Sequence, residues 1–309
     1  MSNRRTFLKQ AFAASAGLAL ATVPQKLMAK KNHAKLTILH TNDIHSHITP
    51  FTEGTLEGKG GLARLSSMIN KVRKEEENVM LLDSGDMFQG TPFFNNFKGE
   101  LIFKIMSQMG YQASTLGNHE FDNGVERLVK SMRYAKFPII NSNYDFSATP
   151  FEGEFIPFQT FFQKGIKVGV YGLGVDPHGL VDPINYKDII YNDPIEVAQR
   201  MERILKEDQK CDVVICLSHL GFEYTIKGQE NKISDKILAP HTQYTDLILG
   251  GHTHTYLKEP FYAINADGKS ILINQTGWGG LHLGRIDIYF DRIGGEVAYV
   301  GASSLENKA

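Results

Sequence analysis

Short runs of β-branched and aliphatic residues alternate along the chain with longer amphipathic stretches. Runs of this kind, bounded by turn residues, predict buried strands. We expect strands over Leu36–His40, Val79–Leu82, Ala113–Leu116, Pro138–Asn141, Lys167–Tyr171, Asp212–Leu217, Asp246–Leu249, Ser270–Asn274 and Arg285–Phe290. Strands that alternate with amphipathic segments favour an α/β fold, in which crossover helices connect parallel strands.

Helical spacing is clearest in three stretches. Apolar residues recur every three or four positions over Leu62–Lys74, and a second helix is expected over Glu100–Met109, where Gly110 ends it. A third helix is expected after Asp193, which precedes a proline and can accept hydrogen bonds from the first turn. Because no repeat or low-complexity linker interrupts residues 35–309, we expect one domain there.

Residues 1–29 have the pattern of a signal peptide. Arg4 and Arg5 precede an uncharged run, Ala11–Val23, and a small residue, Ala29, stands at the expected cleavage point. The run is shorter than the roughly 20 residues that span a bilayer, and it has no polar face for an amphipathic surface helix. The segment Asn3–Lys9 resembles the bacterial twin-arginine export signal. We therefore expect a bacterial periplasmic or secreted protein, without a stable membrane anchor because no cysteine lies near the cleavage region.

Composition narrows the chemistry. The 309 residues carry 33 Lys and Arg against 34 Asp and Glu, a net charge of −1, which gives no electrostatic reason to expect a nucleic acid polymer as partner. Eleven histidines against two cysteines mean that imidazole and carboxylate, not thiolate, would bind a metal. Cys211 and Cys216 lie on one predicted strand, about 16 Å apart, which is too far for a disulfide. We expect both to be core thiols.

Polar clusters follow five of the predicted strands, at the edge where open α/β sheets bind ligands. They are Asp43-Ile44-His45, Gly85-Asp86, Gly117-Asn118-His119-Glu120-Phe121-Asp122, Ser218-His219 and Gly250-Gly251-His252-Thr253-His254. In extended backbone, residues two apart point the same way, so Asp43 and His45, or His252 and His254, can present two ligands to one point. A single histidine of this kind is usually structural, but five such clusters together indicate a metal site.

The ordered series Asp43-x-His45, Gly85-Asp86, Gly117-Asn118-His119-Glu120, His219 and Gly251-His252-x-His254 resembles the motifs of the calcineurin-like metallophosphoesterases. More narrowly, residues 41–45, 85–91 and 118–122 resemble the catalytic domain of the 5′-nucleotidase / UDP-sugar hydrolase family. The resemblance implies a four-layer α/β/β/α sandwich over residues 35–309, with two metal ions at its centre.

The resemblance also implies a ligand set. One metal is expected on Asp43, His45, Asp86 and His254, and the other on Asp86, Asn118, His219 and His252, with Asp86 bridging. Imidazole, carboxylate and amide oxygen suit Mn²⁺, Zn²⁺, Fe or Co²⁺. Two such ions about 3.5–4 Å apart clamp a phosphoryl group and lower the pKa of a shared water, whose hydroxide then attacks phosphorus. Many nucleotidases carry Gln or Asn where this chain has His254, which weakens the expectation of nucleotide specificity.

His119 and Asp122 form the expected catalytic pair. By resemblance, His119 is not a ligand but a transition-state stabiliser and leaving-group acid, oriented by Asp122, and Asn118 and His119 contact the substrate. Asp122 has an alternative role as a helix N-cap. His40 and His47 are expected to be structural or solvent-facing, and Phe88, Phe93, Phe94 and Phe97 to be either core or a contact surface beside the metals.

The leading functional hypothesis is an exported metal-dependent hydrolase of nucleotide or related phosphate monoesters. Hydrolysis of cyclic nucleotides or other phosphodiesters, and a non-catalytic metal-binding subunit, are the alternatives. In the resembled nucleotidases a separate C-terminal domain binds the base, whereas this sequence ends at Ala309. We expect either that a second polypeptide supplies base recognition, docking near Phe88–Phe97, or that the chain works alone as a broad phosphatase.

Overall fold

The computed structural model describes residues 33–229, 232–293 and 296–304. The chain divides into two units, and the account below concerns the second, residues 34–309. The predicted signal peptide, residues 1–29, lies outside the described residues.

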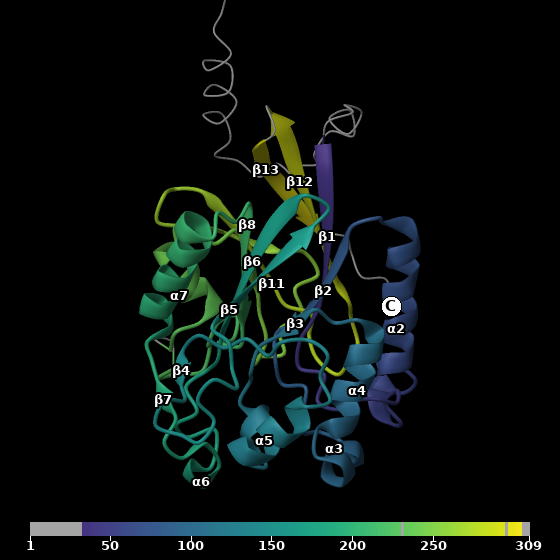
Figure 1. The fold of residues 1–309 in the computed structure, drawn as a ribbon. Helices are drawn as coiled ribbons and strands as arrows, with labels where there is room; N and C mark the ends of the chain where they lie inside the picture. The colour runs from purple at the N-terminus through teal and green to yellow at the C-terminus, as the bar shows by residue number, and fades with distance from the viewer. Residues whose placement is uncertain (1–32, 230–231, 294–295, 305–309) are drawn as a thin grey trace, which may run out of the picture. The chain divides into compact units, whose positions relative to one another are not determined.

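Two sheets form the centre of the unit (Figure 1). The first sheet has the order β13-β12-β1-β2-β3, and its strands are β1 (His33–Thr41), β2 (Val79–Asp83), β3 (Ala113–Ser114), β12 (Gly284–Ile293) and β13 (Glu296–Ser304). The second has the order β10-β11-β9-β8-β6-β5, and its strands are β5 (Phe158–Gln163), β6 (Ile166–Leu173), β8 (Val213–Ser218), β9 (Leu247–Leu249), β10 (Phe261–Ile264) and β11 (Ser270–Asn274). A small ribbon pairs β4 (Tyr144–Asp145) with β7 (Ile190–Tyr191). In both sheets the strands that precede the polar clusters are parallel: β1 with β2, β2 with β3, and β8 with β9.

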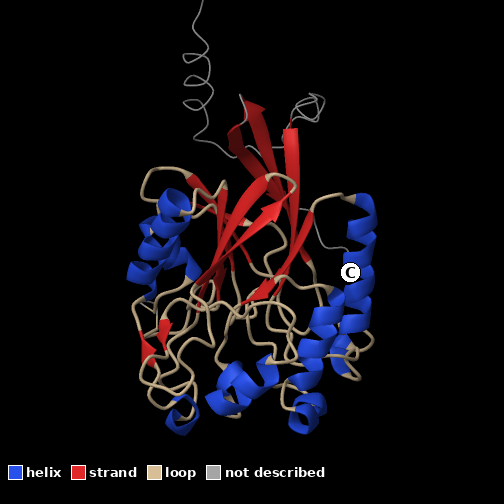
Figure 2. Ribbon diagram, viewed as in Figure 1, coloured by secondary structure: helices blue, strands red, loops and turns tan. Residues whose placement is uncertain are grey.

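Helices lie on both sides of the paired sheets (Figure 2). The α-helices are α2 (Leu62–Glu75), α3 (Pro92–Phe97), α4 (Glu100–Met109), α5 (Val125–Met132), α6 (Pro183–Tyr186), α7 (Pro194–Arg203) and α8 (Asp235–Leu238). The short 3₁₀ turns are η2 (Gly54–Leu56), η3 (His119–Phe121) and η5 (Ala239–His241), and a π-helical turn, η4 (Ile204–Asp208), continues α7.

In the described part of the chain, three hydrophobic cores separate four layers. Alternation along each strand divides its side chains: Leu81 of β2 packs in the core with α2, α4 and α5, whereas Met80 and Leu82 pack between the sheets. On the far side, β8 sends Val214 and Cys216 into a third core against α7. The order is helices, first sheet, second sheet, helix. This is the α/β/β/α sandwich that the family resemblance implies.

The predicted helices are confirmed closely. The helix α4 has the expected bounds, and Gly110 ends it in left-handed backbone, with φ of 78°. At the start of α7, the Asp193 carboxylate accepts hydrogen bonds from the N–H groups of Ile195 and Glu196. The sequence predicts these helix ends well because a capping residue acts on backbone groups only a few residues away.

Two strand predictions are wrong. Pro138–Asn141 is not a strand but makes only isolated bridges, from Ile139 to Ser114 and from Ile140 to Ile156. The strand expected over Ala113–Leu116 ends at Ser114, where the loop that carries Asn118 begins. Cys211 and Cys216 are buried free thiols, as predicted.

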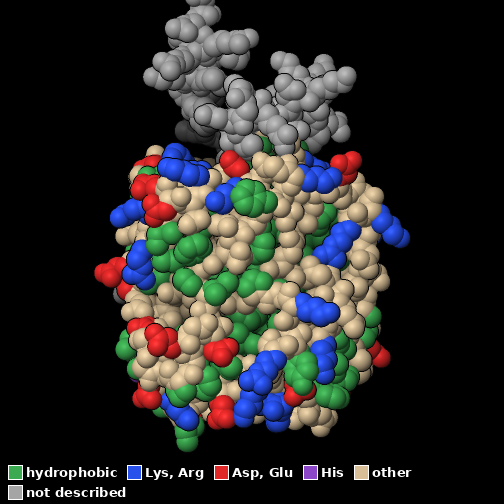
Figure 3. All heavy atoms as spheres, in the orientation of Figure 1, with side chains coloured by type: hydrophobic (Ala, Val, Ile, Leu, Met, Phe, Trp, Pro, Cys, Tyr) green, Lys and Arg blue, Asp and Glu red, His purple; other side chains and the backbone are tan. Residues whose placement is uncertain are grey.

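The surface agrees with the near-neutral charge. On the face shown in Figure 3, basic and acidic side chains are intermingled. Among residues 33–229, 232–293 and 296–304, no helix has the length and apolar character needed to cross a membrane.

Candidate metal centre

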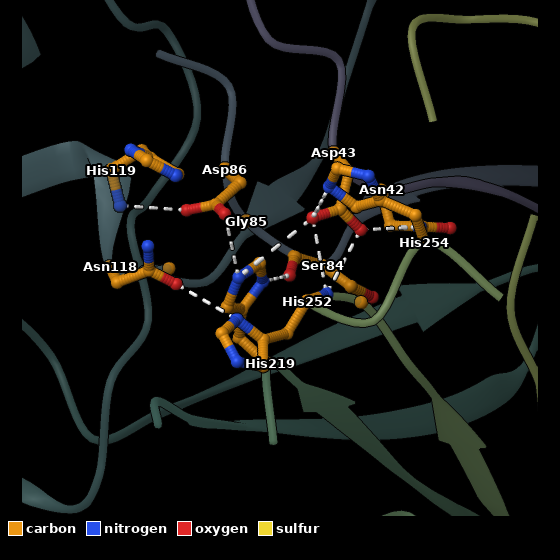
Figure 4. A network of polar contacts seen from close by, with 12 residues as sticks. Asn42, Asp43, Ser84, Gly85, Asp86, Asn118, His119, His219, His252 and His254 are labelled. Carbon is orange, nitrogen blue, oxygen red and sulfur yellow. Dashed lines mark hydrogen bonds and ion pairs between the residues drawn. The ribbon is translucent and has the colours of Figure 1, made fainter. Parts of the chain in front are cut away.

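Loops that follow five parallel strands bring the predicted ligands together (Figure 4). From the first sheet, Asp43 and His45 follow β1, Asp86 follows β2, and Asn118 follows β3. From the second sheet, His219 follows β8, and His252 and His254 follow β9. Each side chain therefore reaches the centre from the carboxyl end of a strand, as the sequence predicts.

One cluster contains Asp43, His45 and His254, whose ligand atoms lie within 4.8 Å of one another. Asp43 Oδ1 is 3.4 Å from His254 Nε2 and 3.8 Å from His45 Nε2. The two imidazole Nε2 atoms face each other at 2.9 Å.

A second cluster contains Asp86, His219 and His252. His219 Nε2 lies 3.0 Å from Asp86 Oδ2, and His252 Nδ1 lies 2.9 Å from Asn118 Oδ1. Asp43 Oδ1 is also 3.9 Å from His219 Nε2, so this carboxylate extends from the first cluster toward the second. The bridging role of Asp86 stays a prediction.

The imidazole nitrogens and carboxylate oxygens of the two clusters suit divalent cations as ligands. The Nδ1 atom of His219 donates to the carbonyl oxygen of Ser84, 2.6 Å away, so the neutral form of the ring would direct its Nε2 lone pair at the centre. That Nε2 atom is buried, and its 3.0 Å approach to Asp86 Oδ2 lacks hydrogen-bond geometry, so it makes no hydrogen bond among the described residues. His45 is held in the same way, with Nδ1 3.1 Å from the carbonyl oxygen of Phe88. Ligand histidines typically donate their second N–H to a carbonyl in this manner, which fixes the tautomer that can bind metal.

Five of the predicted ligands lie in left-handed backbone, which sets the direction of their side chains. Asp43, His45, Asp86, His252 and His254 all have positive φ, between 48° and 76°. The extended geometry expected from the two-residue spacing is therefore wrong. Asp43 and His45 do meet in one cluster, but His252 and His254 enter different clusters. Such backbone is uncommon away from glycine and occurs preferentially at functional sites.

Glycine permits the close approach of two of these loops. A Cβ atom at Gly117 would lie 2.1 Å from Asp86 Oδ1 and 2.6 Å from His219 Nε2. Any side chain at this position would displace a predicted ligand.

In the second cluster, the charges of Asp86 and His219 shift each other's pKa. Burial alone would raise the pKa of Asp86, but the adjacent His219 imidazolium holds it well below its usual range. Burial opposes protonation of His219, yet Asp86 and Asp43 raise its pKa to about 10. Burial and the charge of His219 lower the pKa of His252 to about 4.

His119 and Asp122 lie beside the clusters without belonging to either. His119 Nδ1 is 2.8 Å from Asp122 Oδ2, and both side chains are about 30% exposed (31% and 28%). Burial would lower the pKa of His119, but the hydrogen bond with Asp122 and the charge of Asp86 raise it to about 9. Asp122 is not a helix N-cap, because it follows the turn η3 and Gly124 precedes α5.

The other aromatic residues singled out in the sequence are mostly structural. His40 is fully buried, which lowers its pKa to about 3, and accepts a hydrogen bond from Asn274 Nδ2. His47 stacks on Phe51 with ring centroids 4.2 Å apart. Of the four predicted phenylalanines, Phe88 and Phe94 are core, whereas Phe97 is 46% exposed.

Four residues around the predicted ligands received no role from the sequence, although Asn42 and Glu120 stand within its motifs. Asn42 donates to Asp43 Oδ2, and the ring of Trp278 stacks on His254 at 5.5 Å. Gln275 and Glu120 are buried and hold ligand loops by hydrogen bonds to backbone groups. Gln275 directly follows β11, so the strand-end rule used for the other clusters would have found it.

Comparisons with known proteins agree with this geometry. The family model for calcineurin-like phosphoesterases matches residues 36–256. Rat 5′-nucleotidase is 33% identical over 297 residues, which cover 88% of this chain and 49% of the rat protein. The chain thus spans about half the length of this relative.

Solved structures show the same fold. The 5′-nucleotidase precursor from Thermus thermophilus superposes with a TM-score of 0.75 at 32% identity, covering 89% of this chain and 55% of that one. The calcineurin-like phosphoesterase YfkN from Bacillus subtilis gives a TM-score of 0.73 at 26% identity, covering 89% and 91%. The chain therefore belongs to the calcineurin-like phosphoesterase family, which its motifs predict.

Proposed function

We propose that this protein hydrolyses phosphate monoesters of nucleotides or related compounds with two divalent metal ions. The convergence of two ligand clusters on a separate His119–Asp122 pair carries the proposal. Bound at these clusters, the metals would supply Lewis-acid activation of water and of the phosphoryl group. The proposed ligands are those implied by the motifs: Asp43, His45, Asp86, Asn118, His219, His252 and His254.

The residues of the chain have distinct roles in this proposal. As an imidazolium, the His119 ring can donate a hydrogen bond from Nε2 to a phosphoryl or leaving-group oxygen while Nδ1 donates to Asp122. The backbone N–H of His119 donates to Asp86 Oδ1 at 2.8 Å, which keeps the ring beside the clusters. Proton transfer by a positioned side chain contributes about 10²–10⁴-fold to rate. A storage site has no need of such a pair, which argues against a non-catalytic metal-binding protein.

A substrate panel tests the proposal. The mature protein is stripped with a chelator, reloaded with Mn²⁺, Zn²⁺, Fe²⁺ or Co²⁺, and assayed with an aryl phosphate, AMP, GMP, UMP, a sugar phosphate and a bis-aryl phosphate. We expect metal-dependent release of phosphate from the monoesters. Faster hydrolysis of the bis-aryl ester would favour the phosphodiesterase alternative. No hydrolysis with any metal would exclude the enzymatic function proposed for this chain.

We further propose that the protein is exported by the twin-arginine route to the periplasm or medium. The motivation is Arg4 and Arg5 followed by Phe7-Leu8-Lys9. Replacing both arginines with lysine should leave the precursor in the cytoplasm, as detected by fractionation. Unchanged extracytoplasmic activity in that double variant would rule out the route.

A further inference from the structure

A buried carboxylate joins two of the loops that carry predicted ligands. Glu120 is 1% exposed; it lies in the turn η3, on the segment that follows β3, and its side chain reaches the loop after β2. Its Oε2 atom accepts hydrogen bonds from the N–H groups of Asp86 (2.8 Å) and Gly117 (2.7 Å). Its Oε1 atom accepts from Met87 (2.8 Å) and Phe88 (3.1 Å). Four backbone donors therefore meet one carboxylate, which offers about four acceptor positions when ionised.

These bonds fix the backbone from which the ligands project. Asp86 lies in left-handed conformation, with φ of 53°, and its N–H is held by Glu120. Its carbonyl oxygen accepts the N–H of His45 at 3.0 Å, so the position of this loop also sets that of the loop after β1. On the other loop, Gly117 is held directly beside the predicted ligand Asn118.

We propose that Glu120 is a positioning residue for the metal centre, which sets the distance between the Asp86 and Asn118 loops through its four backbone hydrogen bonds. The inference rests on the proposed two-metal function for the identity of the ligands. Each oxygen of the Glu120 carboxylate accepts two backbone N–H groups. A glutamine at this position would replace one oxygen with an NH₂ group, so two backbone N–H groups would lose their acceptor and would face another donor.

The chain offers a matched control. Glu202 is also buried, at 2% exposure, and also accepts four hydrogen bonds. They come from the N–H groups of Gln243, Tyr244 and Thr245 and from the hydroxyl of Thr245. Glu202 thus links α7 to residues 243–245 by hydrogen bonds, as Glu120 links two loops. None of the partners of Glu202 is a predicted ligand.

The experiment compares Mn²⁺ binding to metal-stripped wild-type protein, E120Q, E120D and E202Q. Isothermal titration gives affinity and stoichiometry, electron paramagnetic resonance reports coupling between paired Mn²⁺ ions, and circular dichroism gives folding and Tm. We expect E120Q to lose about 10- to 100-fold in Mn²⁺ affinity and to lose the coupled signal, since outer partners of metal ligands contribute on that scale. E202Q should lower Tm yet bind Mn²⁺ as the wild type does.

The variant E120D separates position from charge. It keeps the carboxylate but is one methylene shorter, so it should also weaken Mn²⁺ binding. Wild-type affinity in E120D would overturn the inference, whether or not E120Q folds. Equal losses of affinity in E120Q and E202Q would overturn it as well, because Glu120 would then act only on global stability. Activity is assayed separately: an inactive wild type whose Mn²⁺ binding still depends on Glu120 would refute the proposed function alone.

Discussion

The two sheets contribute different chemistry to one site. Loops of the first sheet supply both carboxylates, Asp43 and Asp86, the imidazole of His45, Asn118 and the His119–Asp122 pair, whereas loops of the second supply only imidazoles. Each ligand cluster nevertheless draws on both sheets. Neither sheet can form a cluster alone, so metal binding requires the core between them, where Ile38 and Ile215 are fully buried. The site is thus a product of sheet packing.

The site has two halves, which are the ligand loops of the first sheet and the ligand loops of the second. Different side chains hold the backbone of each half in place. In the first half, the Glu120 carboxylate accepts hydrogen bonds from two ligand loops. In the second, the Gln275 side chain accepts from the N–H of Thr255 and donates to the carbonyl oxygen of Gly251, on either side of the predicted ligands. Asn42 links the two halves: it donates to Asp43, which follows β1 of the first sheet, and to the carbonyl oxygen of Gly277, which follows β11 of the second.

The largest expected effect comes from removing a carboxylate of the first half. Asp86→Ala should lose both metals and lower kcat/KM by more than about 10³-fold, since the proposed bridge is gone and the remaining ligands are mainly neutral imidazoles. His252→Ala, in the second half, should lose only one metal per chain. Elemental analysis of the purified variants measures both. Two metals retained in Asp86→Ala would contradict the bridging role.

The proposed catalytic pair, His119 and Asp122, follows a strand of the first sheet and should act without holding metal. His119→Asn is expected to retain two metals and lower kcat by about 10²–10⁴-fold, the usual contribution of a positioned acid. The exposed pair His178 and Asp176, 3.2 Å apart, provides the control, because His178→Asn removes a similar contact elsewhere. Steady-state kinetics and metal content should separate the two variants. A kcat for His119→Asn equal to that of the wild type would remove the residue from the mechanism.

The positions of the polar clusters were predictable because the clusters follow recognisable strands. Hydrophobic runs such as Val79–Leu82 indicate strands directly, and the polar residues after them mark the edge at which parallel strands present ligands. The division into two sheets was not predicted by periodicity, since strands buried on both faces give no sign of their neighbours. That arrangement came from the resemblance.

Long-range backbone contacts explain what the sequence missed. Ile140 packs between the sheets, yet its segment pairs only through isolated bridges, so an apolar run was mistaken for a strand. The left-handed turns at Asp43 and His252 depend on hydrogen bonds such as that from Asp43 N–H to the carbonyl oxygen of Gly85, and from His252 N–H to the Asp43 carboxylate. No local pattern encodes a bond between residues 209 positions apart.

The smallest effect should come from the amide that fastens the second half. Gln275→Ala leaves the carbonyl oxygen of Gly251 and the N–H of Thr255 without their side-chain partner, so we expect Mn²⁺ affinity to fall by about tenfold, the low end for outer partners of metal ligands. Asn265 is the matched control: it is also buried, donates to a carbonyl oxygen and accepts from two N–H groups, but in a turn that carries no predicted ligand. Titration of metal-stripped Gln275→Ala and Asn265→Ala with Mn²⁺ compares them directly. If the two variants lose Mn²⁺ affinity equally, the loss reflects general destabilisation. Gln275 would then have no particular role in positioning the ligands of the second half.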